Sequence, residues 1–221
     1  MTLRSTVIAA LTLAALGACT SETTSRGLSD PAPLATAGPV AQSAQTAKPA
    51  APQAQTGFAI RAVEVEVPRS LRVSEANMLV PLADIVWRED PRGDRYAQVD
   101  ALMTAAARNA TQDMRRGTPA VLTLTMRRFH ALTERARYTT GGNFAIQFEM
   151  RLSDPKTGAL LAPPRPVVLD IPASGGQRAL DEEARGVTQR VVITAGVVKG
   201  LRDQLAILAR GAAGQPVAAL R

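Results

Sequence analysis

The sequence predicts an α+β domain in which a small, mostly antiparallel sheet carries two helices packed on one face. Two patterns lead to this class. Several segments alternate apolar and polar residues with a period of two, which is typical of half-buried strands, and two longer segments repeat apolar residues every three or four positions, which is typical of amphipathic helices. Their order along the chain is strand, helix, strand, strand, helix, which favours helices stacked on a sheet.

The clearest strand is expected at residues 144–153. There Phe144, Ile146 and Phe148 alternate with polar residues such as Gln147 and Glu149, so one face is apolar and the other mostly polar. The same alternation, or a short apolar run, predicts further strands at residues 63–67, 83–87, 122–127 and 167–171.

The segment after the clearest strand predicts a hairpin. Residues 154–158 contain the Asp, Pro and Gly that tight turns prefer, so the chain should turn back there and form a second strand antiparallel to the first. Pro163, Pro164 and Pro166 then remove backbone donors just before the next strand. That strand is therefore expected at the edge of the sheet.

The first helix is expected over residues 96–114, where apolar residues follow one helical face. Asp94 is a good N-cap, because its carboxylate can accept hydrogen bonds from the first free backbone amides. Gly117 is expected to stop the helix.

The second helix is expected over residues 178–209, with a kink near Gly186. Gly196 and Gly200 weaken the helical pattern, and the Val-Val-Ile-Thr run at 191–194 would also suit a strand. Helix is the interpretation we follow.

The amino terminus has the features of an export signal. Arg4 precedes an apolar run of about ten residues, whereas a membrane-spanning helix needs roughly 20. The run ends in Leu16-Gly17-Ala18-Cys19, which resembles the lipobox of bacterial lipoproteins. The resemblance implies that residues 1–18 form a cleaved signal peptide and that Cys19, the single cysteine of the chain, receives the lipid anchor. The alternative is an ordinary secretory signal followed by an accidental cysteine.

The resemblance also implies a destination. Thr20 follows the cysteine, where lipoproteins retained in the inner membrane usually carry Asp, so we expect the outer membrane, with the protein facing the periplasm. Residues 19–57 are rich in Pro, Ala and Thr and are expected to form a disordered tether with an end-to-end distance of roughly 35 Å. Residues 58–210 are expected to form a single domain, and residues 211–221 a disordered tail.

The charge balance bears on possible partners. The chain has 26 Lys and Arg against 19 Asp and Glu, a formal net charge of +7. A basic surface in the envelope suits anionic lipids or glycans. Nucleic acid is not expected as a partner. The chain has only seven aromatic residues on which bases could stack, and an exported protein is removed from nucleic acid.

A basic segment between two expected strands is the candidate binding site. It is longer than a hairpin needs and could grip anionic groups of an envelope protein, lipid or glycan through bidentate guanidinium contacts. Alternatively, its arginines could pair with Glu134 and Glu149 as a solvated extension of the strands. The candidate arginines are Arg127, Arg128, Arg135 and Arg137.

Catalysis and cofactors are not expected. One cysteine and one histidine, His130, exclude zinc or haem sites built from Cys and His, so no metal or cofactor is predicted. His130 is expected to be a surface or strand-end imidazole bonded to the backbone. Glu89, Asp90 and Asp94 could be read as a hydrolase acid pair, but we expect them to surround a turn in which Asp94 caps the helix.

Three stretches, at residues 83–96, 128–142 and 157–165, resemble an uncharacterised family of small exported lipoproteins. The resemblance implies no activity. The function we expect is a membrane-anchored binding or scaffold module of the cell envelope, accessory to envelope assembly or lipid transport. The alternatives are a hydrolase acting on cell-wall or lipid material and a surface-exposed ligand-binding lipoprotein.

Overall fold

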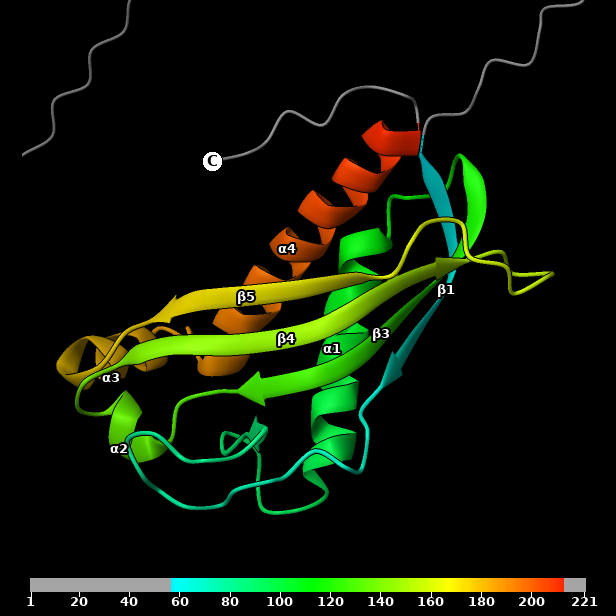
Figure 1. Cartoon of the computed structure of the whole chain (residues 1–221). Helices are drawn as coiled ribbons and strands as arrows, with labels where there is room; N and C mark the ends of the chain where they lie inside the picture. The colour runs from blue at the N-terminus through cyan, green and yellow to red at the C-terminus, as the bar shows by residue number, and fades with distance from the viewer. Residues whose placement is uncertain (1–56, 213–221) are drawn as a thin grey trace, which may run out of the picture. The chain divides into compact units, whose positions relative to one another are not determined.

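A computed structural model describes residues 57–212, in which a five-stranded mixed sheet carries helices on one face, as the α+β class requires (Figure 1). The expected signal peptide, Cys19 and nearly all of the tether lie outside the described residues, as does the expected tail from residue 213. The strands are β1 Phe58–Glu66, β2 Ile85–Val86, β3 Thr118–His130, β4 Gly142–Ser153 and β5 Arg165–Ala173, and the helices are α1 Arg95–Thr111, α2 Glu134–Arg137, α3 Gly176–Ala184 and α4 Gln189–Ala212.

The sheet has the order β1-β3-β4-β5, and β2 lies beside the end of β3. The β3-β4-β5 part is antiparallel, which confirms the expected hairpin and the edge position of β5. β1 and β2 run parallel to β3, since α1 provides the crossover that parallel strands need. The parallel half of the sheet was not expected from the sequence.

One face of the sheet is covered by helices, and the other, which we call the open face, is exposed to solvent. α1 and α4 pack against each other behind the sheet in Figure 1, with contacts to β1 and β5 respectively. Phe144, Ile146 and Phe148 are buried in this core, whereas Gln147 and Glu149 alternate with them on the open face. The period-two pattern therefore records which residues the helices cover.

α1 begins as predicted and ends earlier. Asp94 is its N-cap and accepts hydrogen bonds from the amides of Tyr96 and Ala97 at 3.0 and 3.2 Å. The helix ends at Thr111 instead of residue 114, so Gly117 lies outside it and instead precedes β3.

The expected second helix is two helices. α3 ends at Ala184, and Gly186 has a φ of +80°, a left-handed conformation that ends the helix instead of kinking it. Residues 191–194 are helical, so the strand alternative is wrong. A Cβ on Gly196 would lie 2.4 Å from Cδ1 of Ile171, which shows that this glycine lets α4 approach β5 closely.

Candidate functional site

The candidate site lies where β3 ends. The loop between β1 and α1, the one-turn helix α2 and the start of α4 meet there (Figure 1). Its most unusual feature is a short segment of the loop, residues 77–82, which we call the apolar loop. Its sequence is Asn-Met-Leu-Val-Pro-Leu.

Large apolar side chains of the apolar loop face solvent. Met78 is 53% exposed, Leu79 45%, Val80 69% and Leu82 88%. Four of the nine exposed large hydrophobic side chains in residues 57–212 therefore fall in this one segment. Apolar side chains scattered singly over a surface are ordinary, whereas a cluster of them is a candidate interaction site.

Hydrogen bonds fix the backbone beneath these side chains. The Thr133 hydroxyl donates to the Met78 carbonyl at 2.7 Å, and the backbone amide of Arg135 donates to the Asn77 side-chain oxygen at 2.8 Å. His130 Nε2 lies 3.0 Å from the Pro81 carbonyl oxygen. The loop is thus held at Asn77, Met78 and Pro81, while its apolar side chains are exposed.

His130 is the strand-end imidazole that the sequence predicts. It is the last residue of β3 and is buried under Pro81. Burial lowers the pKa of His130 below its ordinary value and nearby Arg128 lowers it further, against the opposing effect of the hydrogen bond to Pro81. We infer a neutral ring whose Nε2–H donates to the Pro81 carbonyl.

The structure separates the four predicted arginines. Arg127 lies on the open face and pairs with Glu149 at 3.4 Å, as the alternative interpretation expected. Arg137 is only 1% exposed and pairs with Glu183 at 2.7 Å, so it is not the free surface cation that the sequence suggested. Its guanidinium is directed to the interior because it occupies the buried side of α2.

Arg128 and Arg135 have no ion pair among residues 57–212. Arg128 Nε is buried there without any hydrogen-bond partner. Arg135 is linked to the apolar loop through Asn77, and Arg128 is two residues from His130, the residue that holds Pro81. Arg135 therefore borders the apolar loop through its backbone, and Arg128 lies close enough to His130 to lower the pKa of that ring.

Glu134, expected to pair with one of these four arginines, pairs with Arg88 instead. Burial, the largest single influence, raises the pKa of Glu134, but the hydrogen bond and the charge of Arg88 together with a backbone hydrogen bond outweigh it, so the pKa lies below its ordinary value. Arg88 also donates to the backbone of Glu75, whose carboxylate binds Arg95 at 2.6 and 3.0 Å. This network joins the loop to α1 and α2 and supports the apolar loop from below.

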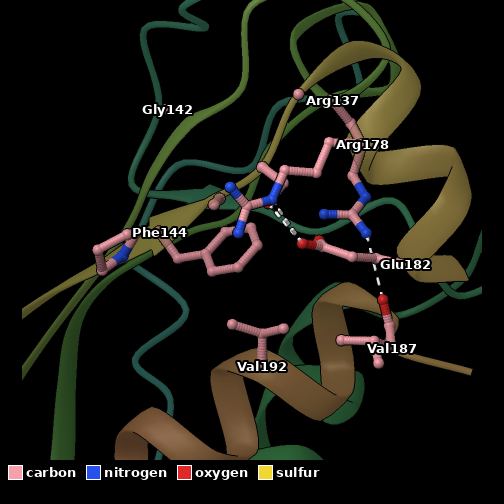
Figure 2. A pocket seen from close by; sticks show the side chains of 11 residues that line it. Arg137, Gly142, Phe144, Arg178, Glu182, Val187 and Val192 are labelled. Atoms are coloured by element: carbon pink, nitrogen blue, oxygen red, sulfur yellow. Dashed lines mark hydrogen bonds and ion pairs between the residues drawn. The ribbon is translucent and has the colours of Figure 1, made fainter.

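A cavity of about 490 Å³ lies beside Arg137 (Figure 2). Phe144 and Val192 form part of its apolar lining, while Arg137 donates to the Val187 carbonyl at 3.4 Å and Arg178 pairs with Glu182 at 3.2 Å. The guanidinium of Arg137 is therefore bound by the protein itself, whereas that of Arg178 is 81% exposed and is held only through Nε.

The three predicted acids hold separate structural positions. Glu89 accepts a hydrogen bond from the Arg190 amide at 3.1 Å, near the start of α4, and Asp90 accepts from Trp87 Nε1 at 2.7 Å and pairs with Arg190. Asp94 caps α1, which confirms that interpretation. Within residues 57–212 no group of three or more His, Cys, Asp or Glu could hold a metal ion, and no helix there is both long and apolar enough to cross a bilayer.

Residues 58–217 match the model of DUF6778, a family of unknown function. The chain belongs to this family. No curated protein matches the sequence. Solved structures similar to this DUF6778 chain include a Xanthomonas campestris protein of the family DUF330, at 9% identity with 73% of this chain and 89% of that chain covered and a TM-score of 0.42.

Two further solved structures are similar. A candidate lipoprotein from Caulobacter crescentus is 19% identical, with 52% of this chain and 84% of that chain covered and a TM-score of 0.30. An uncharacterised protein is 15% identical, with 72% and 94% covered and a TM-score of 0.36. All three TM-scores are below 0.5, so these similarities assign no function to the DUF6778 domain.

The apolar loop is the part of the site that sequence reasoning missed. It lies in a segment for which the sequence predicted only a short strand at 83–87. The available signal was four large apolar residues around Pro81, with neither a helical nor a strand period.

Proposed function

We propose that this protein is a lipid-anchored binding module of the bacterial cell envelope, held in the outer membrane through acylated Cys19 and facing the periplasm. The observation that carries the proposal is the apolar loop, whose exposed side chains stand on a backbone fixed by Thr133, His130 and Arg135. Side chains that avoid the core and yet are held in place are best explained by an external partner.

The proposed lipid anchor rests on the sequence Leu16-Gly17-Ala18-Cys19, which follows a short apolar run. A diacylated and N-acylated cysteine carries several chains, and several chains anchor a protein stably whereas one binds only marginally. The Pro-rich stretch to residue 57 would then let the domain move near the bilayer.

A binding role is favoured over catalysis by the state of the polar groups. His130, Glu89, Asp90 and Asp94 are each engaged in a structural hydrogen bond or ion pair, as is the buried Arg137. Each of these contacts is explained by its part in holding the fold, so none of them requires a catalytic role.

The test is site-specific photocrosslinking in cells. A photoreactive amino acid replaces Val80 in the apolar loop or, as a matched control, Val168, which is 59% exposed on β5. We expect the label at position 80 to form crosslinked adducts with a binding partner, and the label at position 168 to form none. The adducts from position 80 should diminish when Cys19→Ser releases the protein from the membrane. Equal adducts from both positions, or none from position 80 in the anchored protein, would contradict the proposal.

A further inference from the structure

We infer that the apolar loop, together with Arg128 and Arg135, docks onto an anionic lipid surface. The inference rests on the proposed function, since the lipid anchor at Cys19 is what keeps the domain beside a bilayer. It assigns the contact to lipid headgroups and the upper acyl region, and it gives the two unpaired arginines a ligand.

The first argument is the pairing of apolar and cationic groups in one place. Lipid interfaces bind segments that combine apolar side chains, which enter the acyl boundary, with Lys or Arg, which meet the phosphates. Val80 and Leu82 supply the apolar part, and Arg128 and Arg135 supply the cationic part. A guanidinium binds phosphate oxygens through two parallel hydrogen bonds.

The second argument is that the acids near the loop are already neutralised. Glu134 pairs with Arg88, and Asp84 lies 3.7 Å from Arg72. Arg128 and Arg135 have no such partner among the residues described, so positive charge beside the loop is uncompensated. That charge is complementary to an anionic surface and would oppose a cationic partner.

The third argument is size. A stable protein interface involves about 20–30 residues on each side, whereas the apolar loop has six residues and two flanking arginines. A contact this small is weak in free solution. It becomes effective when an anchor on the same chain makes it intramolecular, because the tether then sets a high local concentration of lipid surface.

The length of chain between Cys19 and the domain permits this docking. β1 starts at Phe58, which pairs with Thr118 at the start of β3, so the tether joins the end of the sheet opposite the apolar loop. β3 spans about 43 Å at 3.3 Å per residue. The roughly 38 residues from Cys19 to Gly57 extend to at most about 130 Å, which is ample for the loop to face the anchored bilayer.

The test uses the full lipidated protein, purified from membranes and reconstituted into vesicles. In the variant Leu82→Cys, acylation of Cys19 leaves the new cysteine as the only free thiol, which is labelled with the environment-sensitive fluorophore nitrobenzoxadiazole. On phosphatidylcholine vesicles containing phosphatidylglycerol we expect a blue-shifted, severalfold stronger emission than on phosphatidylcholine alone. The same label at Val168→Cys should respond to neither vesicle.

Charge variants complete the test. In the Leu82→Cys protein, Arg128→Gln together with Arg135→Gln should abolish the response to phosphatidylglycerol, whereas Arg127→Gln, an exposed arginine on the open face, should leave it unchanged. Circular dichroism melting identifies any variant that has unfolded. In that case Arg135→Gln alone, which changes an exposed side chain and keeps its backbone bond to Asn77, provides the comparison.

The outcomes separate this inference from the proposed function. If the protein floats with the vesicles but emission from position 82 equals that from position 168, lipid docking is overturned and the anchor stands. Equal emission on both vesicle types overturns the assignment to anionic lipid. Loss of flotation, with a second label on Cys19 found by mass spectrometry, overturns the lipid anchor itself.

Discussion

The helix-covered core and the end of the domain around the apolar loop place their side chains in opposite ways. In the core, Phe148 and Leu124 are inside and polar residues face solvent. At the loop end, Arg137 and Arg95 are buried in ion pairs while Leu82 and Val80 face solvent. The loop end also buries apolar residues such as Trp87 and Phe129, so it departs from the usual rule of burial only at these arginines and at the apolar loop.

This difference in burial implies that the two regions contribute differently to the stability of the domain. Burying apolar surface stabilises the core, whereas a buried charge pair is stabilising only if its partners compensate for desolvation. The buried pairs Arg137–Glu183 and Arg95–Glu75 are therefore expected to add less net stability than apolar burial does. The exposed apolar loop is explained by the docking that we propose for it, and substitutions in the two regions should differ accordingly.

The largest effect is expected in the core. Phe148→Ala removes a buried aromatic ring between β3 and β5, and the lost burial plus the cavity should lower the free energy of unfolding by about 3–5 kcal/mol. Urea denaturation measures this. Val168→Ala, on the exposed side of β5, is the control and should change stability by less than about 0.5 kcal/mol. Equal effects of the two substitutions would contradict the assignment of faces.

The next effect is expected at the buried ion pair. Arg137→Met leaves Glu183 without its guanidinium partner, and breaking a buried pair on one side costs about 3–5 kcal/mol. Glu183 is partly solvated and keeps a hydrogen bond from the Tyr138 hydroxyl, so we expect about 2–3 kcal/mol. The matched control is Arg127→Met, an exposed pair worth about 0–1 kcal/mol. A neutral Arg137→Met would show that the pair does not support this end of the domain.

The strands and α1 could be predicted because their signals are local. Alternation over residues 144–153 and the Asp94 cap depend only on near neighbours in sequence, and both are found in the structure. The parallel pairing of β1 with β3 could not be predicted in this way, because strand direction is set by contacts some 60 residues apart. Gly196 was a helix-weakening residue in the sequence, and only the approach of Ile171 explains it.

The arginine segment shows why the site was predicted only in part. Arg135 and Arg137 look equivalent in sequence, yet on a helix two positions are about 200° apart, so α2 exposes one and buries the other. The one local signal for the start of the short helix is Thr133, whose hydroxyl accepts a hydrogen bond from the Ala136 amide as the N-cap of α2. The apolar loop has no periodicity, and its exposure depends on distant partners, namely His130 and Thr133.

A smaller effect is expected from His130, which holds the apolar loop as a neutral ring. The pKa of His130 in the folded protein is lowered. Above pH 6.5, the ordinary pKa, the ring is therefore neutral in both the folded and the unfolded protein, and stability does not depend on its protonation. As pH falls below 6.5, the unfolded chain takes up a proton that the folded protein refuses, and stability should drop by up to about 1.4 kcal/mol per pH unit until the folded pKa is reached. Urea denaturation between pH 6.5 and 5 measures this slope.

The control for that slope is His130→Gln, which can keep a donor to the Pro81 carbonyl and does not titrate. The slope between pH 6.5 and 5 should flatten in this variant. Carboxylates such as Glu75, whose pKa is lowered chiefly by the hydrogen bond from Arg95, lose their contribution only as pH falls through and below about 4.5, outside this window. An unchanged slope would place the responsible group elsewhere.

The smallest effect on stability is expected from the apolar loop itself. Replacing Leu79, Val80 and Leu82 by Ser removes side chains that are 45–88% exposed, so little burial is lost and the free energy of unfolding should change by less than about 0.5 kcal/mol per substitution. Urea denaturation of this triple variant should show stability retained. The photocrosslinking yield should be lost in the double variant Leu79→Ser with Leu82→Ser, which leaves position 80 free for the photoreactive amino acid. A destabilisation as large as that of Phe148→Ala would mean that these side chains pack against the rest of the protein. The apolar loop would then be part of the core and not an exposed surface.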